Sequence, residues 1–193
     1  CGPAVFNERK RGLEIPDETS LVRRAQQNDR QALEELFWIN YPILLGALIR
    51  ITGDPRSSED IAQETVLRAI VNLERYEPRA KFSTWLITIA LNTHKNKLRT
   101  ARREILTEDV FETGSEEEST EEKALRNMAV DEAMSLLDAL GPEKRQVFVL
   151  RHYYGFKYEE IADAVGCPIG TVRSRLHDSV EILRREISRR DMK

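Results

Sequence analysis

Residues 158–183 read YEEIADAVGCPIGTVRSRLHDSVEIL, and this stretch decides the fold. Ile161, Ala162 and Val165 are spaced as on one side of a helix, which predicts a short amphipathic helix. Gly166 follows as the residue best able to adopt the left-handed conformation that ends a helix. Pro168 cannot easily continue that helix but is tolerated where a new one begins. The pattern therefore predicts two helices joined by a tight turn.

The second of these helices has two contrasting faces. Its apolar residues are three or four positions apart, which gives a stripe suited to burial: Ile169, Val172, Leu176, Val180 and Leu183. The opposite face and its flanks are small, polar or basic: Gly170, Thr171, Arg173, Ser174, Arg175 and His177. A small residue, a turn glycine and an apolar anchor at this spacing favour a helix-turn-helix that reads the major groove of DNA. An ordinary helical hairpin with a solvated basic face is the alternative.

The composition indicates an all-α protein of one large or two small domains. Of the 193 residues, 40% are hydrophobic and 33% are charged, and no segment sustains the alternation of a strand. No apolar run reaches the roughly 18–20 residues that span a bilayer, and no secretory signal pattern is visible. We therefore expect a cytoplasmic protein without membrane insertion of its own. The two cysteines and three histidines have no metal-ligand spacing, so we expect no metal. No paired-carboxylate metal site, phosphate-binding loop or nucleophile–base arrangement stands out either, so we expect no cofactor and no enzymatic site.

Charge is distributed unevenly along the chain, although the net charge is only −3. Residues 103–128 contain nine acidic and three basic residues, whereas residues 17–102 and 129–193 are each nearly neutral. The acidic segment is rich in Glu, Ser and Thr and has few periodic hydrophobic residues, which is typical of a flexible linker. We therefore expect an N-terminal extension at 1–16 and two helical domains, 17–102 and 129–193, joined by an acidic linker.

The first of these domains has three helical segments before its basic part. Residues 17–27 and 30–51 have helical periodicity, and Pro42 should kink or divide the second segment. After a Gly-Asp-Pro break, Ser57 is the expected N-cap of a helix over residues 58–76. Beside its apolar stripe this helix has a second, mostly polar stripe at i, i+3, i+4 and i+7: Asp60, Gln63, Glu64 and Leu67. A leucine among polar residues favours a partner-docking face, with a solvated face as the alternative.

Residues 79–103 contain seven basic residues and no acidic one. Ser83 or Thr84 can cap a helix that runs to about Arg102. Three aromatic residues lie before or within this segment: Tyr76, Phe82 and Trp85. Basic side chains neutralise phosphates, aromatic rings stack on unpaired bases and amides read base edges. The segment therefore favours contact with single-stranded or partly melted DNA, and the alternative is that Phe82 and Trp85 are core residues.

Three stretches, in this order, resemble the extracytoplasmic-function group of bacterial RNA polymerase sigma factors. They are SSEDIAQETVLRAIVNLERYEP (57–78), FSTWLITIALNTHKNKLR (82–99) and LGPEKRQVFVLRHYYGFKYEEIADAVGCPIGTVRSRL (140–176). The resemblance covers about residue 17 to the C-terminus. It implies two small helical domains, sigma regions 2 and 4, that bind core RNA polymerase and direct it to promoters with −10 and −35 elements.

The resemblance also implies roles for individual residues. It places core-polymerase contacts at Asp60, Gln63, Glu64 and Leu67. It places contacts to the −10 element, where a base is extruded from the non-template strand, at Tyr76, Lys81, Phe82, Trp85, Asn92, Lys95, Asn96, Arg99 and Arg102. It places contacts to the −35 element at Thr171, Arg173, Ser174, Arg175 and His177.

The chain departs from the family pattern in one place. The family usually has Asn, Asp and Arg at the spacing that Asn92, Asn96 and Arg99 occupy here, so one carboxylate is missing. The resemblance further implies regulation by an anti-sigma factor that covers the DNA-binding and core-binding faces. A conventional helix-turn-helix regulator that binds duplex DNA alone is the alternative function, although it leaves the basic–aromatic segment unexplained.

Overall fold

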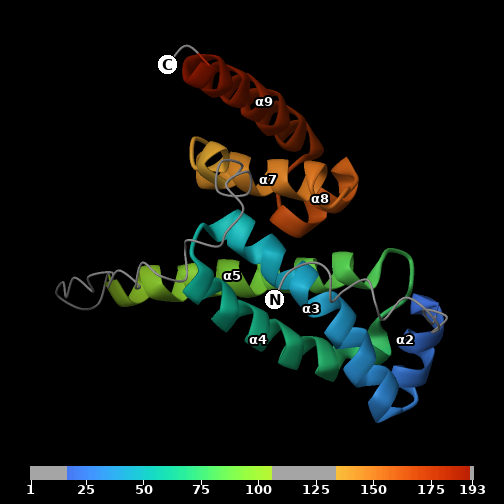
Figure 1. The fold of residues 1–193 in the computed structure, drawn as a ribbon. Helices are drawn as coiled ribbons and strands as arrows, with labels where there is room; N and C mark the ends of the chain where they lie inside the picture. Colours follow the sequence, from blue (N-terminus) through green and yellow to red (C-terminus); the bar gives the residue numbers. More distant parts are fainter. Residues whose placement is uncertain (1–16, 106–133, 192–193) are drawn as a thin grey trace, which may run out of the picture.

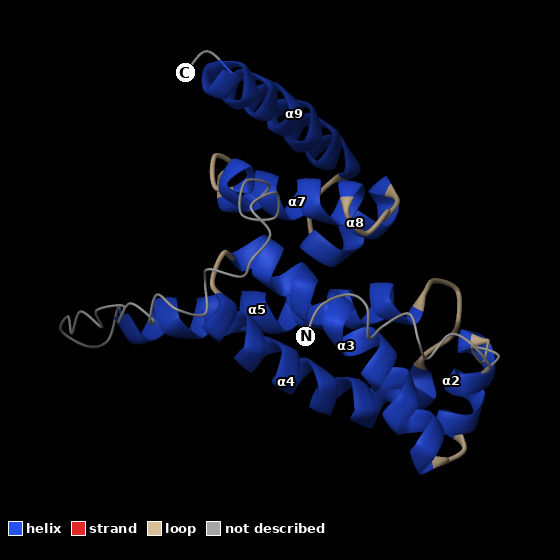
Figure 2. Cartoon of the chain, in the orientation of Figure 1, coloured by secondary structure: helices blue, strands red, loops and turns tan. Residues whose placement is uncertain are grey.

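The computed structural model describes residues 17–105 and 134–191, and every regular element within these ranges is helical (Figure 1 and Figure 2). This confirms the all-α class for the described part of the chain. In chain order the elements are α2 (Glu18–Gln26), α3 (Arg30–Thr52), α4 (Pro55–Asn72), the 3-10 helix η1 (Leu73–Arg75), α5 (Phe82–Ile105), α7 (Pro142–His152), α8 (Tyr158–Val165) and α9 (Ile169–Asp191). The extension expected at 1–16 and most of the linker expected at 103–128 lie outside the described residues.

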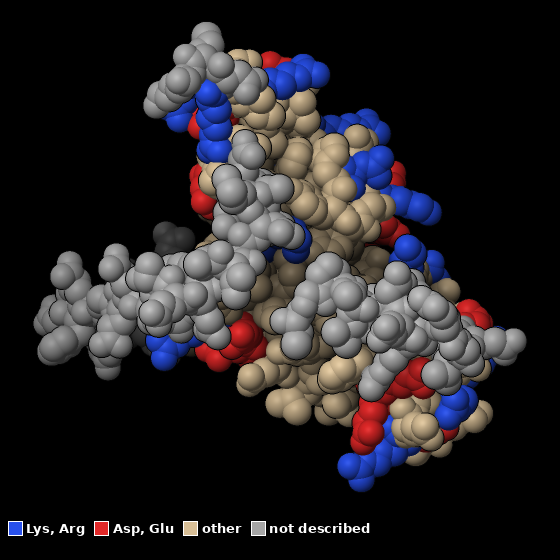
Figure 3. Space-filling model, viewed as in Figure 1, with Lys and Arg blue, Asp and Glu red and all other residues tan. Residues whose placement is uncertain are grey.

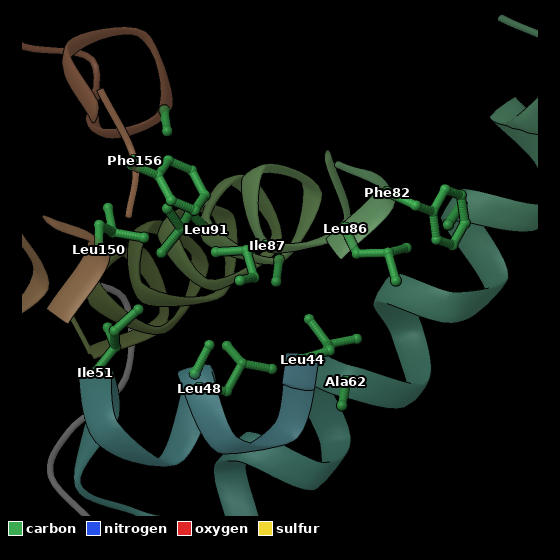
Figure 4. Close-up of a cluster of buried hydrophobic side chains, with 14 of the residues drawn as sticks. Leu44, Leu48, Ile51, Ala62, Phe82, Leu86, Ile87, Leu91, Leu150 and Phe156 are labelled. Atoms are coloured by element: carbon green, nitrogen blue, oxygen red, sulfur yellow. The ribbon is translucent and has the colours of Figure 1, made fainter. Parts of the chain in front are cut away.

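Helix α3 is the central helix of the first bundle, in which it packs against α2, α4 and α5 (Figure 1). Its buried face includes Leu44 and Leu48, each 1% exposed. Figure 4 shows these two side chains close to Ala62 of α4 and to Leu86 and Ile87 of α5. Burial of this apolar seam is the main force that holds the four helices together.

Helix α3 is also long and apolar enough, by length and composition, to cross a membrane, which the sequence analysis did not anticipate. In the structure it is a core helix, with neighbours in both bundles. It is more apolar than its core position requires because Trp38, Ile39 and Ile43 lie on its exposed surface. These surface residues explain why a helix of a bundle has the apolar composition of a membrane-spanning helix.

The expected division of this segment at Pro42 does not occur, because α3 continues unbroken through the proline. Proline removes one helical hydrogen bond, the bond to the carbonyl four residues earlier, which here is that of Trp38. Both residues are exposed, so water can hydrogen-bond the freed carbonyl. The proline is tolerated because it lies on the solvent side of the helix.

The prediction of Ser57 as an N-cap is wrong. Helix α4 begins at Pro55, and Asp54 is its N-cap. The Asp54 carboxylate accepts hydrogen bonds from the backbone N–H groups of Arg56 and Ser57, at 3.0 and 3.2 Å. An aspartate followed by a proline at the first helical position is a strong helix start, and here it lies three residues earlier than the serine.

The second bundle consists of α7, α8 and α9, which pack around a small core. Phe156, Ile161 and Val172 are each at most 1% exposed. Gly166 follows α8 with a φ of 74°, and its N–H donates to the carbonyl of Ala162 at 2.9 Å. The predicted helix–turn–helix between residues 158 and 183 is therefore confirmed.

The two bundles are in contact with each other. Helices α3 and α5 of the first lie against α7 and α8 of the second. Figure 4 shows Ile51 and Leu91 of the first bundle beside Leu150 and Phe156 of the second. A single apolar cluster thus continues from one bundle into the other.

Two arginines add polar contacts to this interface. Arg145 of α7, only 7% exposed, donates from Nε to the backbone carbonyl of Arg50 at 2.5 Å and forms an ion pair with Asp138 at 2.6 Å. The guanidinium of Arg50 lies over the ring of Tyr153, 5.2 Å from its centroid, and hydrogen-bonds the Tyr154 hydroxyl at 3.5 Å. Such cation–π contacts stabilise by about 0.5–1 kcal/mol at exposed sites.

Candidate nucleic-acid-binding and docking surfaces

Helix α9 buries one side and presents the other to solvent. Val172 and Leu176 anchor it on the second bundle, at 0% and 6% exposure. Arg173, Ser174 and His177 are exposed, and Thr171 is partly buried. Figure 3 shows Lys and Arg side chains along the outer edge of this bundle. Because the major groove admits an α-helix, this face has the shape and charge to enter duplex DNA.

Arg175 differs from its neighbours on α9. Its side chain is 20% exposed, and its Nη2 forms an ion pair with the carboxylate of Glu143 on α7. The fold therefore uses this arginine to fasten α9 to α7. Only a fifth of its side chain is left exposed for a contact with DNA.

The polar residues predicted on α5 also gather on one sector of that helix. Asn92, Lys95, Asn96 and Arg99 are all exposed and fall within one third of the helix circumference, by their spacing. Lys81, which directly precedes α5, is exposed as well. Arg102 lies in the last turns of α5, but its side chain is outside the described residues. Asn92, Lys95, Asn96 and Arg99 thus place basic and amide groups on one exposed sector of α5.

The aromatic residues near the start of α5 form a cluster with Phe37. Phe82 is fully buried, and its ring lies 5.6 Å from that of Phe37, 5.3 Å from Tyr76 and 5.4 Å from Trp85. Tyr76 is 5% exposed, donates from its hydroxyl to the carbonyl of Ala80 at 2.7 Å, and has its pKa raised to about 12 by burial. Tyr76 and Phe82 thus support the backbone and present no free ring face, whereas Trp85 is only partly buried.

Two polar residues of α2 that no motif singles out contact this segment. Glu18 accepts a hydrogen bond from the backbone N–H of Phe82, and Gln26 donates to the carbonyls of Leu73 and Tyr76. The partners lie between 47 and 64 positions apart in the chain. No local pattern signals contacts at such separations.

The polar stripe of α4 is on the surface, as the docking interpretation requires. Asp60 and Gln63 are exposed. Glu64 is partly buried, and its carboxylate pairs with Arg68 at 2.6 Å and with Lys97 of α5 at 3.4 Å. The stripe is therefore linked by an ion pair to the polar sector of α5.

The same helix exposes more apolar surface than the sequence analysis marked. Leu67 is 66% exposed, Ile70 42% and Val71 82%. Figure 3 shows a largely uncharged area over α3 and α4 at the lower centre of the molecule. Contiguous exposed apolar residues beside polar ones are typical of protein–protein contact sites.

Two known families match the chain, one in each bundle. The sequence model of the Sigma-70 region 2 family matches residues 36–104, and that of the Sigma-70 region 4 family matches residues 131–183. The matches cover the helices that form both candidate DNA-binding surfaces and the α4 surface. Helix α2 lies outside them.

Whole-chain relatives and solved structures agree with these matches. The chain is 32% identical to the RNA polymerase sigma-H factor of Pseudomonas aeruginosa, over 84% of this chain and 90% of that protein. It is 30% identical to the ECF RNA polymerase sigma-E factor of Haemophilus influenzae, over 87% and 94%. The sigma factor RpoE of Bartonella quintana, solved with the anti-sigma factor NepR, shares the fold with a TM-score of 0.66, at 23% identity over 82% of this chain and 98% of that one. CnrH, solved with the cytosolic domain of CnrY, has a TM-score of 0.60 at 20% identity, over 89% and 97%.

The helix-turn-helix, the basic sector of α5 and the surface of α4 occur together in the order of this family, and curated relatives align over most of the chain. The expected family is therefore confirmed. The chain belongs to the extracytoplasmic-function (ECF) group of sigma-70 factors, the initiation subunits that bind core RNA polymerase and direct it to specific promoters.

Proposed function

We propose that the two bundles divide promoter recognition between them. The domain of residues 17–102 docks on core polymerase and engages the −10 element, and the domain of residues 129–193 engages the −35 element. The observation that carries this proposal is the sorting of faces on α4, α5 and α9. Each helix buries an apolar face and exposes most of the polar and basic residues assigned to a partner, although these residues are spread over more than 100 positions of sequence. The exceptions are Glu64, Thr171 and Arg175, which are partly buried.

The exposed surface of α4 is the proposed core-polymerase contact. This surface includes the exposed residues Asp60, Gln63 and Leu67, and the partly buried Glu64 lies beside them. Val71 adds apolar area beyond the predicted set. A partly apolar patch with polar neighbours suits a stable protein contact better than contact with phosphates.

The loop of residues 77–81, here called the −10 loop, and the polar sector of α5 are the proposed −10 contact. Extrusion of a base from the duplex costs a few kcal/mol, which stacking and hydrogen bonds in a pocket must offset. Lys81 and Lys95 supply charge for phosphates, and Asn92 and Asn96 supply donors and acceptors for base edges. Trp85 is the aromatic residue with surface left for stacking.

Helix α9 is the proposed −35 reader, with Thr171, Arg173, Ser174 and His177 toward the DNA. Run-off transcription with purified core polymerase on genomic promoter fragments tests the whole proposal. Specific transcripts that appear only with this protein are expected. Duplex binding by the protein without any transcript would instead favour the conventional regulator.

A matched pair of variants tests the α4 surface. Leu67→Glu places a charge in the proposed contact and should weaken binding to core polymerase at least tenfold. Ile187→Glu changes another exposed apolar residue, 44% exposed near the end of α9, and should leave core binding unchanged. Equal effects of the two substitutions would contradict the assignment of α4.

We also propose that an anti-sigma factor controls this protein in the cytoplasm. The solved RpoE and CnrH structures, which share this fold, are complexes with NepR and with the cytosolic domain of CnrY. The exposed apolar residues of α4 give such a partner a site to cover. The test is competition: a candidate anti-sigma protein should displace core polymerase from this chain and suppress the run-off transcript. Simultaneous binding of both partners with transcription intact would overturn the proposal.

A further inference from the structure

Side chains of α2 hold both ends of the −10 loop. The Gln26 side-chain amide donates to the carbonyl of Leu73 at 3.0 Å and to that of Tyr76 at 2.9 Å. The Glu18 carboxylate accepts from the backbone N–H of Phe82 at 3.0 Å. Because Glu18 and Gln26 lie at opposite ends of α2, one short helix contacts the backbone on both sides of the loop.

The predicted capping of α5 by Ser83 or Thr84 is wrong, because the helix begins at Phe82 and both residues lie inside its first turn. Glu18 takes the place of the side-chain cap. Lys81 is at the N-cap position of α5, since its carbonyl accepts from the N–H groups of Thr84 and Trp85 at 3.0 and 3.2 Å. A lysine side chain has no acceptor, so it cannot bond the free N–H groups at the helix start. Glu18 supplies the acceptor from α2, and its negative charge suits the positive end of the helix dipole. Lys81 itself is exposed, so its ammonium can face a ligand.

The contact of Gln26 fixes the other end of the loop. A side-chain amide has two donor hydrogens, and here both are used, one on the carbonyl of Tyr76 where the loop begins. Within the loop, the Tyr76 hydroxyl donates to the carbonyl of Ala80. The backbone is thus tied at residues 76, 80 and 82. A loop ordered before binding loses less conformational freedom when it captures a ligand.

We propose that α2 is the positioning element of the −10 loop, and that Glu18 and Gln26 are positioning residues for recognition of melted −10 DNA. The inference rests on the proposed role of that loop. Neither residue lies within the matched Sigma-70 region 2 segment, which starts at residue 36. Both act through the backbone, without touching the DNA.

The test measures binding of holoenzyme to the single-stranded non-template −10 segment of a promoter identified by run-off transcription. Gln26→Leu and Glu18→Leu, which remove the donor and the acceptor, should each weaken this binding at least fivefold while affinity for core polymerase stays within twofold. Glu18→Gln keeps an acceptor oxygen and should retain most of the binding. Gln27→Leu, which changes the exposed neighbour of Gln26, is the matched control and should bind like the wild type.

Three outcomes decide the matter. Selective loss of −10 binding, with rescue in Glu18→Gln, supports positioning. Wild-type −10 binding by both leucine variants, or a parallel loss of core affinity and thermal stability, overturns it. Lys81→Ala and Asn92→Ala test the proposed −10 contact itself. If these two variants weaken −10 binding and the α2 variants do not, only the proposed role of α2 is wrong. If none of the variants weakens −10 binding, the −10 assignment of the loop is wrong as well.

Discussion

At the scale of single residues, Gly166 has a backbone conformation that other residues adopt only under strain. Its φ is 74°, and a Cβ at this position would lie 3.2 Å from the Nζ of Lys95. The left-handed conformation costs an L-residue about 1–2 kcal/mol. Gly166→Ala should therefore lower the free energy of unfolding by about that amount, as measured by urea denaturation.

Gly170 provides the control for this substitution. It lies within α9, and an added Cβ would meet nothing within 4 Å. Alanine is favoured over glycine in a helix by about 1 kcal/mol, so Gly170→Ala should raise the stability. Changes of the same sign in the two variants would contradict the account of the turn.

His94 links stability to pH. Burial lowers its pKa below the ordinary value of 6.5, and the positive charge of Lys97 acts in the same direction. The unfolded chain has the higher pKa, so it takes up the proton first as the pH falls. Stability should therefore decrease as the pH falls below about 6.5 and through the pKa of the folded state.

The variant His94→Gln should show a shallower loss of stability between pH 7 and pH 5, measured by urea denaturation at a series of pH values. Some dependence will remain because burial also lowers the pKa of His152. The reference is the wild-type protein, denatured at the same series of pH values. An unchanged slope in His94→Gln would exclude this histidine as the source.

Residue types in the sequence identified the exposed sector of α5 and the outward face of α9, because helical spacing determines which side chains share a face. They could not identify tertiary partners. Tyr76 and Phe82 have the composition of a stacking site, yet both are buried in an aromatic cluster with Phe37, more than 35 positions away. Burial depends on what another helix brings to the site, and local composition does not contain that information.

At the scale of elements, two arginines two residues apart on α9 should behave differently. Arg173 is exposed, whereas Arg175 is paired with Glu143 of α7. Arg173→Ala should weaken −35 duplex binding by about 1–3 kcal/mol if it reads a base edge, with little change in stability. Arg175→Ala should mainly reduce stability, because it leaves α9 less firmly attached to α7.

Fluorescence anisotropy with a −35 duplex and thermal unfolding of both variants separate these effects. Arg184→Ala, an exposed arginine further along α9 that pairs with Glu181, is the control for general loss of charge. If Arg173→Ala and Arg184→Ala weaken binding equally, Arg173 contributes only nonspecific attraction.

Periodicity located most helices, but their ends followed rules that depend on context. Asp54 and Ser57 are both acceptable caps, and the proline after Asp54 decides between them. A proline divides a helix where the lost hydrogen bond cannot be replaced. At Pro42 the freed carbonyl lies on the solvent side of the helix, where water can replace the bond. The neighbouring proline settles the case of Asp54, whereas Pro42 depends on the burial of the surrounding side chains, which the sequence indicates only indirectly.

At the scale of the whole molecule, the contact between the bundles was not predictable from either bundle alone. It joins Ile51 and Leu91 to Leu150 and Phe156, residues that each bundle could have buried within itself. It also brings Lys95, assigned to −10 phosphates, next to the turn glycine of the helix-turn-helix. One closed arrangement thus places the two candidate DNA-binding units against each other.

The two promoter elements bound at the same time require a different arrangement. Their names place them about 25 base pairs apart, which is about 85 Å of duplex at roughly 3.4 Å per base pair. The chain between residues 105 and 134 can reach about 95 Å at full extension, so it is long enough to allow this separation. With one element bound by each bundle, as proposed, the bundles must come apart before both elements are bound, and every contact between them should oppose promoter binding.

A substitution of Arg50 tests whether contacts between the bundles oppose promoter binding, and it changes neither hydrophobic core. Arg50→Ala removes the contact with the Tyr153 ring and the bond to the Tyr154 hydroxyl, and it leaves the backbone carbonyl that Arg145 uses. Loss of a contact of about 0.5–1 kcal/mol should raise the ratio of open to closed molecules about two- to fivefold. Energy transfer between dyes on Arg56→Cys and Ser188→Cys, with the native cysteines replaced by serine, should fall accordingly.

The control is Arg30→Ala, which removes an exposed ion pair with Glu34 at the other end of α3 and should leave energy transfer unchanged. If Arg50→Ala also keeps the wild-type transfer, the arginine does not hold the bundles together. If transfer falls while promoter binding by holoenzyme stays the same, polymerase alone supplies the free energy of opening. A fall in transfer together with faster promoter binding would show that the closed contact between the bundles slows promoter engagement, because the free energy of that contact has to be overcome before the −10 and −35 surfaces can reach their separate sites.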